Sequence, residues 1–331
     1  AAVGEWWGGD VKLTTRMLKR HNIIAGGEFV YNARQDQSNY DEQPYSPYLD
    51  DKRNSRTWAL YVQDEFTILE NLILNIGLRY DHYDTFGGTT NPRVALIYRP
   101  LDLTAVKLLY GTAFRAPSPY ELYYNDGNVS SKANPDLKPE MIETYELVLE
   151  QILGKGFRMA GSLFFNRIKD LISLETDAAD GLSVYRNIEK LETKGAELEL
   201  EKKWDNGLKG LISYSYQETE NTQTGEAVTN SPNHLIKAKL MVPLLKNKIF
   251  AGLEQHYTSQ RKLLNGSDAG SFFMTNLTLS TQNFIQGMEV SMSVYNLLGQ
   301  TYEDPASLEH RQSAIEQDGL GFRLKMIYKF W

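Results

Sequence analysis

The sequence contains no cysteine, which excludes a disulfide scaffold and any cysteine-ligated metal site. It also lacks any long uninterrupted apolar run, and its mean hydropathy is -0.44. A membrane-spanning helix is therefore excluded, because such a helix needs about 20 apolar residues in succession. A membrane β-barrel is not excluded, since its strands show only alternating hydrophobicity.

Motifs of catalysis and of nucleic-acid binding are absent as well. There is no GxSxG, no HExxH and no glycine-rich phosphate loop, so we expect neither enzyme activity nor a cofactor. The formal net charge of -7 disfavours nucleic-acid binding.

The five histidines lie far apart. The segment Tyr80-Asp81-His82-Tyr83-Asp84 offers metal ligands at a strand end, but we interpret it as a solvated rim and predict no metal site.

Alternating hydrophobicity is the dominant pattern that is present. Residues 58–66 and 72–80 each alternate apolar and mostly polar positions, and only residues 69–71 separate them, which predicts a hairpin. Further short joints are expected at 100–102, 153–156, 205–207, 244–247 and 284–287. Long connections are expected at 36–54, 116–140, 175–192, 219–232, 259–271 and 298–319. Tight turns at one rim and long loops at the other are typical of membrane barrels.

The predicted strands run about ten to fifteen residues, longer than the five or six that are usual in soluble sheets. We therefore predict an all-β fold, a transmembrane antiparallel β-barrel with about fifteen strands. A soluble all-β binding protein is the alternative. An odd count does not suit a complete single-chain barrel, so we expect that strands are missing upstream.

Residues 107–140 hold the most specific signal, a strand followed by a proline-broken, tyrosine-bearing loop. Three of its segments resemble the mid-barrel signature of TonB-dependent outer-membrane receptors: Phe114-Arg115-Ala116-Pro117-Ser118, Tyr120-Glu121-Leu122-Tyr123 and Asn134-Pro135-Asp136-Leu137-Lys138-Pro139-Glu140. Other segments resemble later parts of the same barrels: residues 61–66, 77–81, 296–298 and 322–325. The resemblance extends over nearly the whole chain.

The resemblance implies a plugged barrel of about 22 strands in the outer membrane of a Gram-negative bacterium. Residues 1–331 would be a partial barrel that lacks the plug domain and the first strands. The implied function is uptake of a scarce nutrient chelate, driven by the TonB complex acting through the plug.

No histidine lies between Phe114-Arg115-Ala116-Pro117 and Asn134-Pro135-Asp136-Leu137, which disfavours the haem receptors of this family, because haem needs an axial ligand. We favour a ferric siderophore or a cobalamin-like ligand. A haem receptor and a passive porin-like channel are the alternatives.

The candidate binding residues lie in the central loop and at the strand end before it. Tyr120, Tyr123, Tyr124 and Asp126 are candidates for cargo binding, since tyrosine offers a rigid apolar face with a polar tip. The alternative for the tyrosines is an aromatic girdle at the outer rim. By alternation Arg115 faces the lumen, where it would meet an anionic cargo or the plug. Glu197, Glu199 and Glu201 would form an acidic stripe that faces inward.

The final strand ends on an aromatic residue. Its alternating positions are Phe322, Leu324, Met326, Tyr328 and Phe330, followed by Trp331. This ending resembles the signal that the outer-membrane barrel assembly machinery reads. The expected partners are therefore outer-membrane lipid, the assembly machinery, the TonB complex and an iron-siderophore or cobalamin-like ligand.

Overall fold

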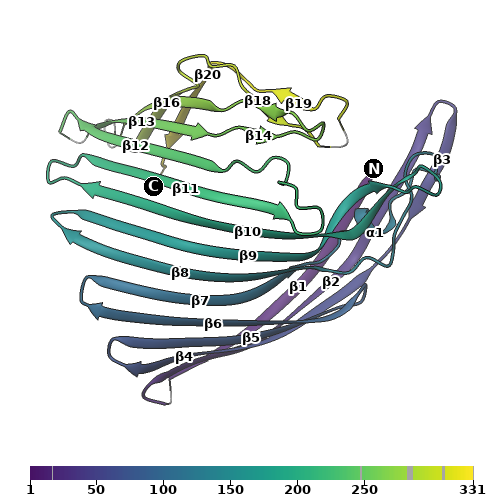
Figure 1. The fold of residues 1–331 in the computed structure, drawn as a ribbon, viewed down its shortest axis with the longest axis horizontal. Helices are drawn as coiled ribbons and strands as arrows, with labels where there is room; N and C mark the ends of the chain where they lie inside the picture. Colours follow the sequence, from purple (N-terminus) through teal and green to yellow (C-terminus); the bar gives the residue numbers. More distant parts are fainter. Residues whose placement is uncertain (17, 247, 282–285, 308–309, 331) are drawn as a thin grey trace.

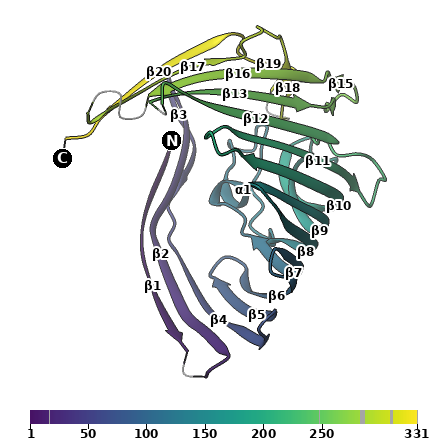
Figure 2. The same ribbon diagram turned by 90° about the vertical axis from the view of Figure 1, so that its left-hand side faces the viewer.

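The structure, a computed structural model, describes residues 1–16, 18–246, 248–281, 286–307 and 310–330. Within these residues sixteen strands form one curved antiparallel sheet (Figures 1 and 2). Fifteen of them follow one another across the sheet and β3 pairs only with β2, so the predicted number of strands is confirmed. No helix in the described part of the chain is long and apolar enough to cross a membrane.

The strands of the sheet follow chain order, with β1 and β20 at its two edges. Their bounds are β1 (Ala2–Thr15), β2 (His21–Glu42), β3 (Tyr45–Asp51), β4 (Ser55–Leu69), β5 (Leu72–Tyr83), β6 (Gly87–Leu101), β7 (Thr104–Arg115), β8 (Glu140–Gly154), β9 (Phe157–Thr176), β10 (Ser183–Lys203), β11 (Lys209–Asn221), β12 (His234–Leu244), β13 (Ile249–Thr258), β16 (Phe272–Thr281), β17 (Met288–Tyr295) and β20 (Gly321–Tyr328). The connections hold helix α1 (Pro119–Tyr123) and two short ribbons, β14 (Arg261–Lys262) with β15 (Asp268–Ala269) and β18 (Glu303–Pro305) with β19 (Ala314–Glu316).

The two faces of the sheet differ in polarity. Helix α1 lies on the concave side (Figure 2), and Arg115 at the end of β7 reaches Glu121 of this helix. Arg115 and, by strand alternation, Lys107 therefore face the concave side, while Leu108 faces the convex side. The register carries this division across the sheet. Large apolar side chains stand exposed on the convex face, among them Leu60, Leu78, Leu147, Leu163, Leu198, Ile212, Leu253 and Met292.

Tight turns join the strands at one end of the sheet and most connections at the other end are longer, as predicted (Figure 1), although only residues 84–86 join β5 to β6 there. Two of the expected long loops are nevertheless wrong. Residues 36–54 mostly continue β2 and form β3, and a register shift between Asn39 and Tyr40 lets Pro47 enter the ladder of this short strand. Residues 175–192 mostly extend β9 and β10, where register shifts after Asn187 interrupt the alternation that the prediction needed. Asn247, Phe284 and Ile285 of the expected joints lie outside the described residues.

The final strand has the expected alternation. Phe322, Leu324, Met326 and Tyr328 are exposed along the convex face of β20, and Phe330 is exposed beyond its end. Trp331 lies outside the described residues.

Aromatic rings cover glycines of neighbouring strands at several places. The side chain of Phe164 on β9 lies over Gly195 on β10, and Tyr61 on β4 covers Gly26 on β2 in the same way. A β-carbon at Gly195 would also lie 2.5 Å from the carbonyl oxygen of Tyr216. The ring thus occupies the space of the missing side chain and adds cross-strand contact.

Replacing Gly195 by Ala is therefore expected to lower the free energy of unfolding by about 1–3 kcal/mol, the usual cost of overpacking. The measurement is a urea titration of the protein in detergent micelles, followed by tryptophan fluorescence. Gly9→Ala is the matched control on β1, because nothing lies within 4 Å of a β-carbon built there. Equal midpoints for the two variants would contradict the expectation.

Candidate functional site

The loop of residues 116–139 begins with a helix whose start is fixed by its own side chains. Ser118 is the N-cap and Pro119 occupies the first turn, where a missing N–H costs nothing. The Ser118 hydroxyl accepts from the N–H of Glu121 at 3.3 Å, and the Glu121 carboxylate accepts from the N–H of Ser118 at 2.7 Å. This reciprocal pair is a capping box, so the local sequence dictates α1.

Arg115 joins the helix to both flanking strands. Its guanidinium donates to Glu121 at 2.9 and 3.0 Å and to Glu140, the first residue of β8, at 2.6 Å through two nitrogens. Glu140 also accepts from the N–H of Ile172 on β9. Arg115 faces the concave side as expected, but two carboxylates already bind it. Contact between Arg115 and an anionic cargo or a plug stays a prediction. The hydrogen bonds of Arg115 show that it anchors the loop to β7 and β8.

The three candidate tyrosines bridge the elements on either side of the loop. Tyr120 stacks on Tyr124 with ring centroids 4.5 Å apart and meets Tyr185 of β10 edge-on. Tyr124 accepts a hydrogen bond from Asn39 of β2 at 3.2 Å. The Tyr123 ring lies 3.5 Å below the guanidinium carbon of Arg53. Tyr120 is the most open of the three, with 45% of its surface exposed.

Asp126 organises the backbone that follows the helix. Its carboxylate accepts from the N–H groups of Val129, Ser130 and Ser131 at 2.9–3.0 Å and from the Ser130 hydroxyl. Burial alone would raise the pKa of this carboxyl, but these hydrogen bonds outweigh it and lower the pKa to about 2. Asp126 is therefore a structural residue of the loop, and its role in cargo binding stays a prediction.

The loop is docked against the extended hairpin of β9 and β10. Leu122 and Leu137 pack on Ile172 in a small buried cluster. Asn187 and Lys138 are joined by two hydrogen bonds of 2.8 Å, because the side-chain amide accepts from the backbone N–H and donates to the carbonyl. Lys132 pairs with two carboxylates of the hairpin end, Asp177 and Asp180. On the opposite side, Gln37 of β2 donates to the carbonyl of Pro119.

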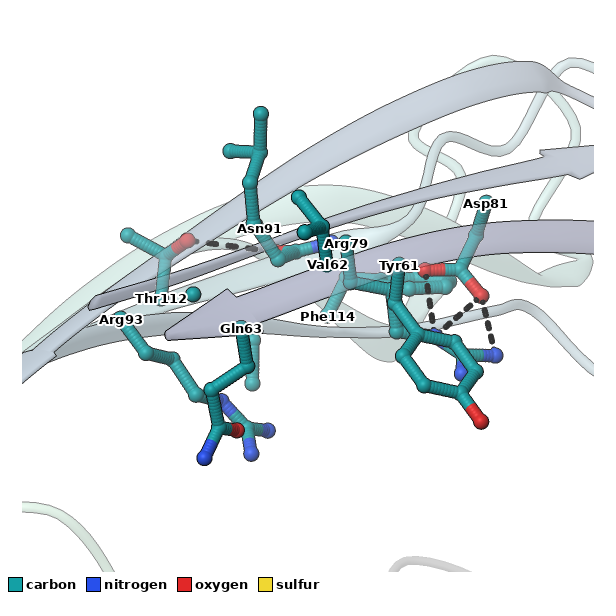
Figure 3. Close-up of a pocket in the computed structure, with 12 residues that line it drawn as sticks. Tyr61, Val62, Gln63, Arg79, Asp81, Asn91, Arg93, Thr112 and Phe114 are labelled. Carbon is teal, nitrogen blue, oxygen red and sulfur yellow. Dashed lines mark hydrogen bonds and ion pairs between the residues drawn. The ribbon is translucent and has the colours of Figure 1, made fainter. Parts of the chain in front are cut away.

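A pocket of about 440 Å³ lies on the sheet where β7 leads into this loop (Figure 3). Arg79 on β5 binds Asp81 at 2.9 and 3.1 Å and Glu28 of β2 at 2.9 Å. Asp81 is only 2% exposed, so the interpretation of residues 80–84 as a solvated rim is wrong for this residue. Asp81 and His82 face opposite sides of the strand. In the described part of the chain, no group of three potential metal ligands occurs.

Arg93 on β6 differs from Arg79, the other arginine that lines the pocket. Its guanidinium makes no hydrogen bond or ion pair within the described residues. Its cross-strand neighbours are Gly77 and Gly111, neither of which has a side chain to cover it. In Figure 3 its guanidinium extends from the strands beside Gln63, with Tyr61 pointing the same way. An unpaired guanidinium in a pocket that the Gln63 amide and the Tyr61 phenol also line can bind a carboxylate or a similar oxyanion.

Sequence reasoning did not single out Arg79 or Arg93 and assigned Asp81 to a solvated rim, although all three occupy concave-facing positions of alternating strands. The signal available in the sequence was a charged residue at a position that strand alternation places on the inward face. The same signal did identify the acidic stripe of Glu197, Glu199 and Glu201 on β10. Glu197, Glu199 and Glu201 do face the concave side, where Glu199 lies 3.6 Å from Arg158 and Glu201 lies 2.9 Å from Lys203.

Replacing Arg115 by Gln is expected to loosen the loop, because Glu121 and Glu140 would lose their shared partner. The loss of about 1.5 kcal/mol or more should speed amide exchange in residues 119–139 by about tenfold or more. Hydrogen exchange with mass spectrometry measures it. Arg158→Gln is the control, since Arg158 makes only longer ion pairs, at 3.6 and 3.9 Å, away from the loop. Unchanged exchange in the Arg115 variant would refute this anchoring role.

The Asp126 turn should open only in strong acid. Because its pKa is lowered to about 2, the stabilisation is complete above the ordinary value of about 3.9 and is lost as the pH falls towards 2. Pepsin, which is active across this range, should cleave residues 126–131 at pH 2 but not at pH 4. Asp126→Asn, which lacks the charge, should be cleaved at both. Identical digestion of variant and wild type would rule out the turn's dependence on the carboxylate.

Comparison with known proteins places this geometry in a family. The family model described as TonB dependent receptor-like, beta-barrel matches residues 3–297. The iron-regulated outer membrane virulence protein of Vibrio cholerae is 32% identical over 201 residues, which cover 55% of this chain and 31% of that protein. Heme/hemopexin utilization protein C of Haemophilus influenzae is 24% identical, with 97% of this chain and 51% of that protein covered.

Solved structures agree on the fold. A variant of the ferric enterobactin receptor of Pseudomonas aeruginosa matches with a TM-score of 0.81 at 16% identity, covering 99% of this chain and 54% of that receptor. This chain thus spans about half, or less, of the length of these relatives. Its open sheet corresponds to a large part of their outer-membrane barrel, and the alternative of a soluble all-β protein does not hold. Since the family model covers most of the sequence, the chain belongs to the TonB-dependent receptors, as a portion of their β-barrel.

Proposed function

We propose that this chain takes part in the uptake of a scarce nutrient chelate, of the ferric siderophore or cobalamin class, with energy supplied by the TonB complex. The observation that supports it best is the unpaired Arg93 guanidinium in the pocket of about 440 Å³ on the concave face. In a barrel this face lines the lumen, so a cation there would meet whatever passes through. An anionic iron chelate is the cargo that such a group favours.

The loop of residues 116–139 would provide the first contact. Its exposed Tyr120 offers a flat ring to a chelate that carries aromatic or planar groups. Phe114 lines the pocket, and Arg115 begins the anchoring of the loop. A cargo held by the loop would therefore leave it close to Arg93.

A haem receptor is the second candidate, because Heme/hemopexin utilization protein C matches 97% of this chain. The absence of a histidine between Phe114-Arg115-Ala116-Pro117 and Asn134-Pro135-Asp136-Leu137 weighs against it, as does the fold match to a receptor for ferric enterobactin. Direct competition between cargoes distinguishes these two classes.

We also propose that the receptor has further parts beyond this sequence. A plug domain and the first strands of the barrel would complete it, since the chain covers 54% of the matched ferric enterobactin receptor. TonB would act through that plug. The barrel assembly machinery would read the alternating residues of β20 together with Phe330 and Trp331, and lipid would surround the convex face.

The test is uptake by cells that express the full-length receptor. Radioactive iron supplied as an anionic tricatecholate chelate is expected to enter, and Arg93→Gln should reduce its uptake by about tenfold. This factor corresponds to the loss of a charge-assisted hydrogen bond worth about 1.5 kcal/mol. Lys237→Gln is the control, because Lys237 faces the concave side of β12 and makes no ion pair within the described residues.

Haemin and cyanocobalamin serve as competing cargoes in the same cells. Competition by haemin alone would favour the haem receptor. Uptake that continues without TonB would favour a passive channel and overturn the proposed energy coupling. If Arg93→Gln and Lys237→Gln transport the chelate equally, Arg93 has no part in cargo passage.

A further inference from the structure

The convex face carries an apolar groove across β10 to β13 that the uptake of cargo does not use. It encloses about 370 Å³. The small side chain of Ala238 on β12 leaves space between larger neighbours, next to Gly210 on β11, which the Trp204 ring covers. Leucine and isoleucine side chains line the groove: Leu200, Ile212, Leu240 and Leu253. Because this face is turned to lipid in the barrel family, hydrocarbon is the natural occupant of such a groove.

A cation and two aromatic rings close one end of the groove. The Lys202 ammonium lies 4.3 Å from the centroid of Phe157 and 5.7 Å from that of Trp204. The Trp204 ring lies against Gly210, where a β-carbon would come within 3.3 Å of it. Lys202 is thus held at a fixed place by aromatic contacts on two sides.

The hydrogen-bonding capacity of Lys202 is only partly used. Its ammonium donates to the backbone carbonyl of Lys155. An ammonium has three N–H donors, so two remain, and within the described residues Lys202 makes no ion pair. The neighbouring Lys203 faces the concave side and pairs with Glu201 at 2.9 Å. The unpaired charge of this strand end therefore lies on the lipid side.

The position along the strands fixes the level in the membrane. Lys202 lies beside the tight turns at residues 153–156 and 204–208. In this class of barrel the tight turns are periplasmic. The ammonium is thus at the headgroup level of the periplasmic leaflet, and the groove extends from it into the hydrocarbon.

We propose that this groove is a binding site for one phospholipid of the periplasmic leaflet. An acyl chain occupies the space over Ala238, beside the Trp204 ring, and the lipid phosphate accepts hydrogen bonds from Lys202. An aromatic girdle alone would supply rings and a lysine at the interface, but without a groove that leads away from the charge. The Lys202 ammonium can bind an anion and the apolar groove can bind a hydrocarbon chain. A lipid that carries a phosphate has both groups in one molecule. This inference depends on membership of the family and not on the identity of the cargo.

The test uses the full-length receptor in mild detergent, titrated with dioleoyl phosphatidylglycerol and observed by native mass spectrometry. Lys202→Gln is expected to weaken binding of one lipid by about tenfold, as one charge-assisted interaction is lost. Lys203→Gln is the matched control, since it removes the same charge from the adjacent residue on the opposite face. Ala238→Phe should also abolish retention, because the ring fills the groove while Lys202 stays intact.

Dioleoyl glycerol, which has the same chains but no phosphate, separates the two parts of the site. Its binding should be insensitive to Lys202→Gln and lost in Ala238→Phe. Unchanged heat-dependent gel mobility shows that each variant is folded. The proposal is overturned if Lys202→Gln and Ala238→Phe retain phosphatidylglycerol like the wild type, or if Lys203→Gln loses as much as Lys202→Gln.

Discussion

A strand inside a lipid bilayer has no water to bind, so each backbone N–H and C=O must find a partner on a neighbouring strand. The continuous ladders meet this demand for the strands between β1 and β20, which are the two edges of the described sheet and each pair on one side only. Continuous pairing in turn fixes which residues share a face. The lipid-facing leucines and the charged residues of the lumen are therefore two consequences of one constraint on hydrogen bonding.

The site follows from the same register. Arg93 is open because its neighbours in the ladder are Gly77 and Gly111, while Arg79, two pairs further along, meets Asp81 and Glu28. Two arginines of similar position thus differ in their pairing because of the residues beside them. Arg79 is bound by carboxylates of the sheet, and the guanidinium of Arg93 stays unpaired within the described residues.

The fold could be predicted from the sequence because alternation and turn residues are local signals. Strand number, the order of tight turns and the inward stripe of Glu197 on β10 all followed from them. The extension of β9 and β10 could not, because the register shifts near Asn187 break the period of two. The roles of Arg115 and Asp126 were also beyond local reasoning. Arg115 depends on Glu140, which is distant in sequence, and the Asp126 carboxylate is occupied by backbone N–H groups that composition does not mark.

The contacts of the loop fall into two sets, which together determine how it can move. The first set lies inside the loop and includes the hydrogen bonds between Ser118 and Glu121 and between Asp126 and Ser130. The second set ties the loop to its surroundings through hydrogen bonds with Gln37, Ser183 and Asn187. If only the second set breaks, residues 116–139 keep their internal shape. The loop would then swing as one rigid body about a hinge at Arg115 and Glu140, where its two ends join adjacent strands.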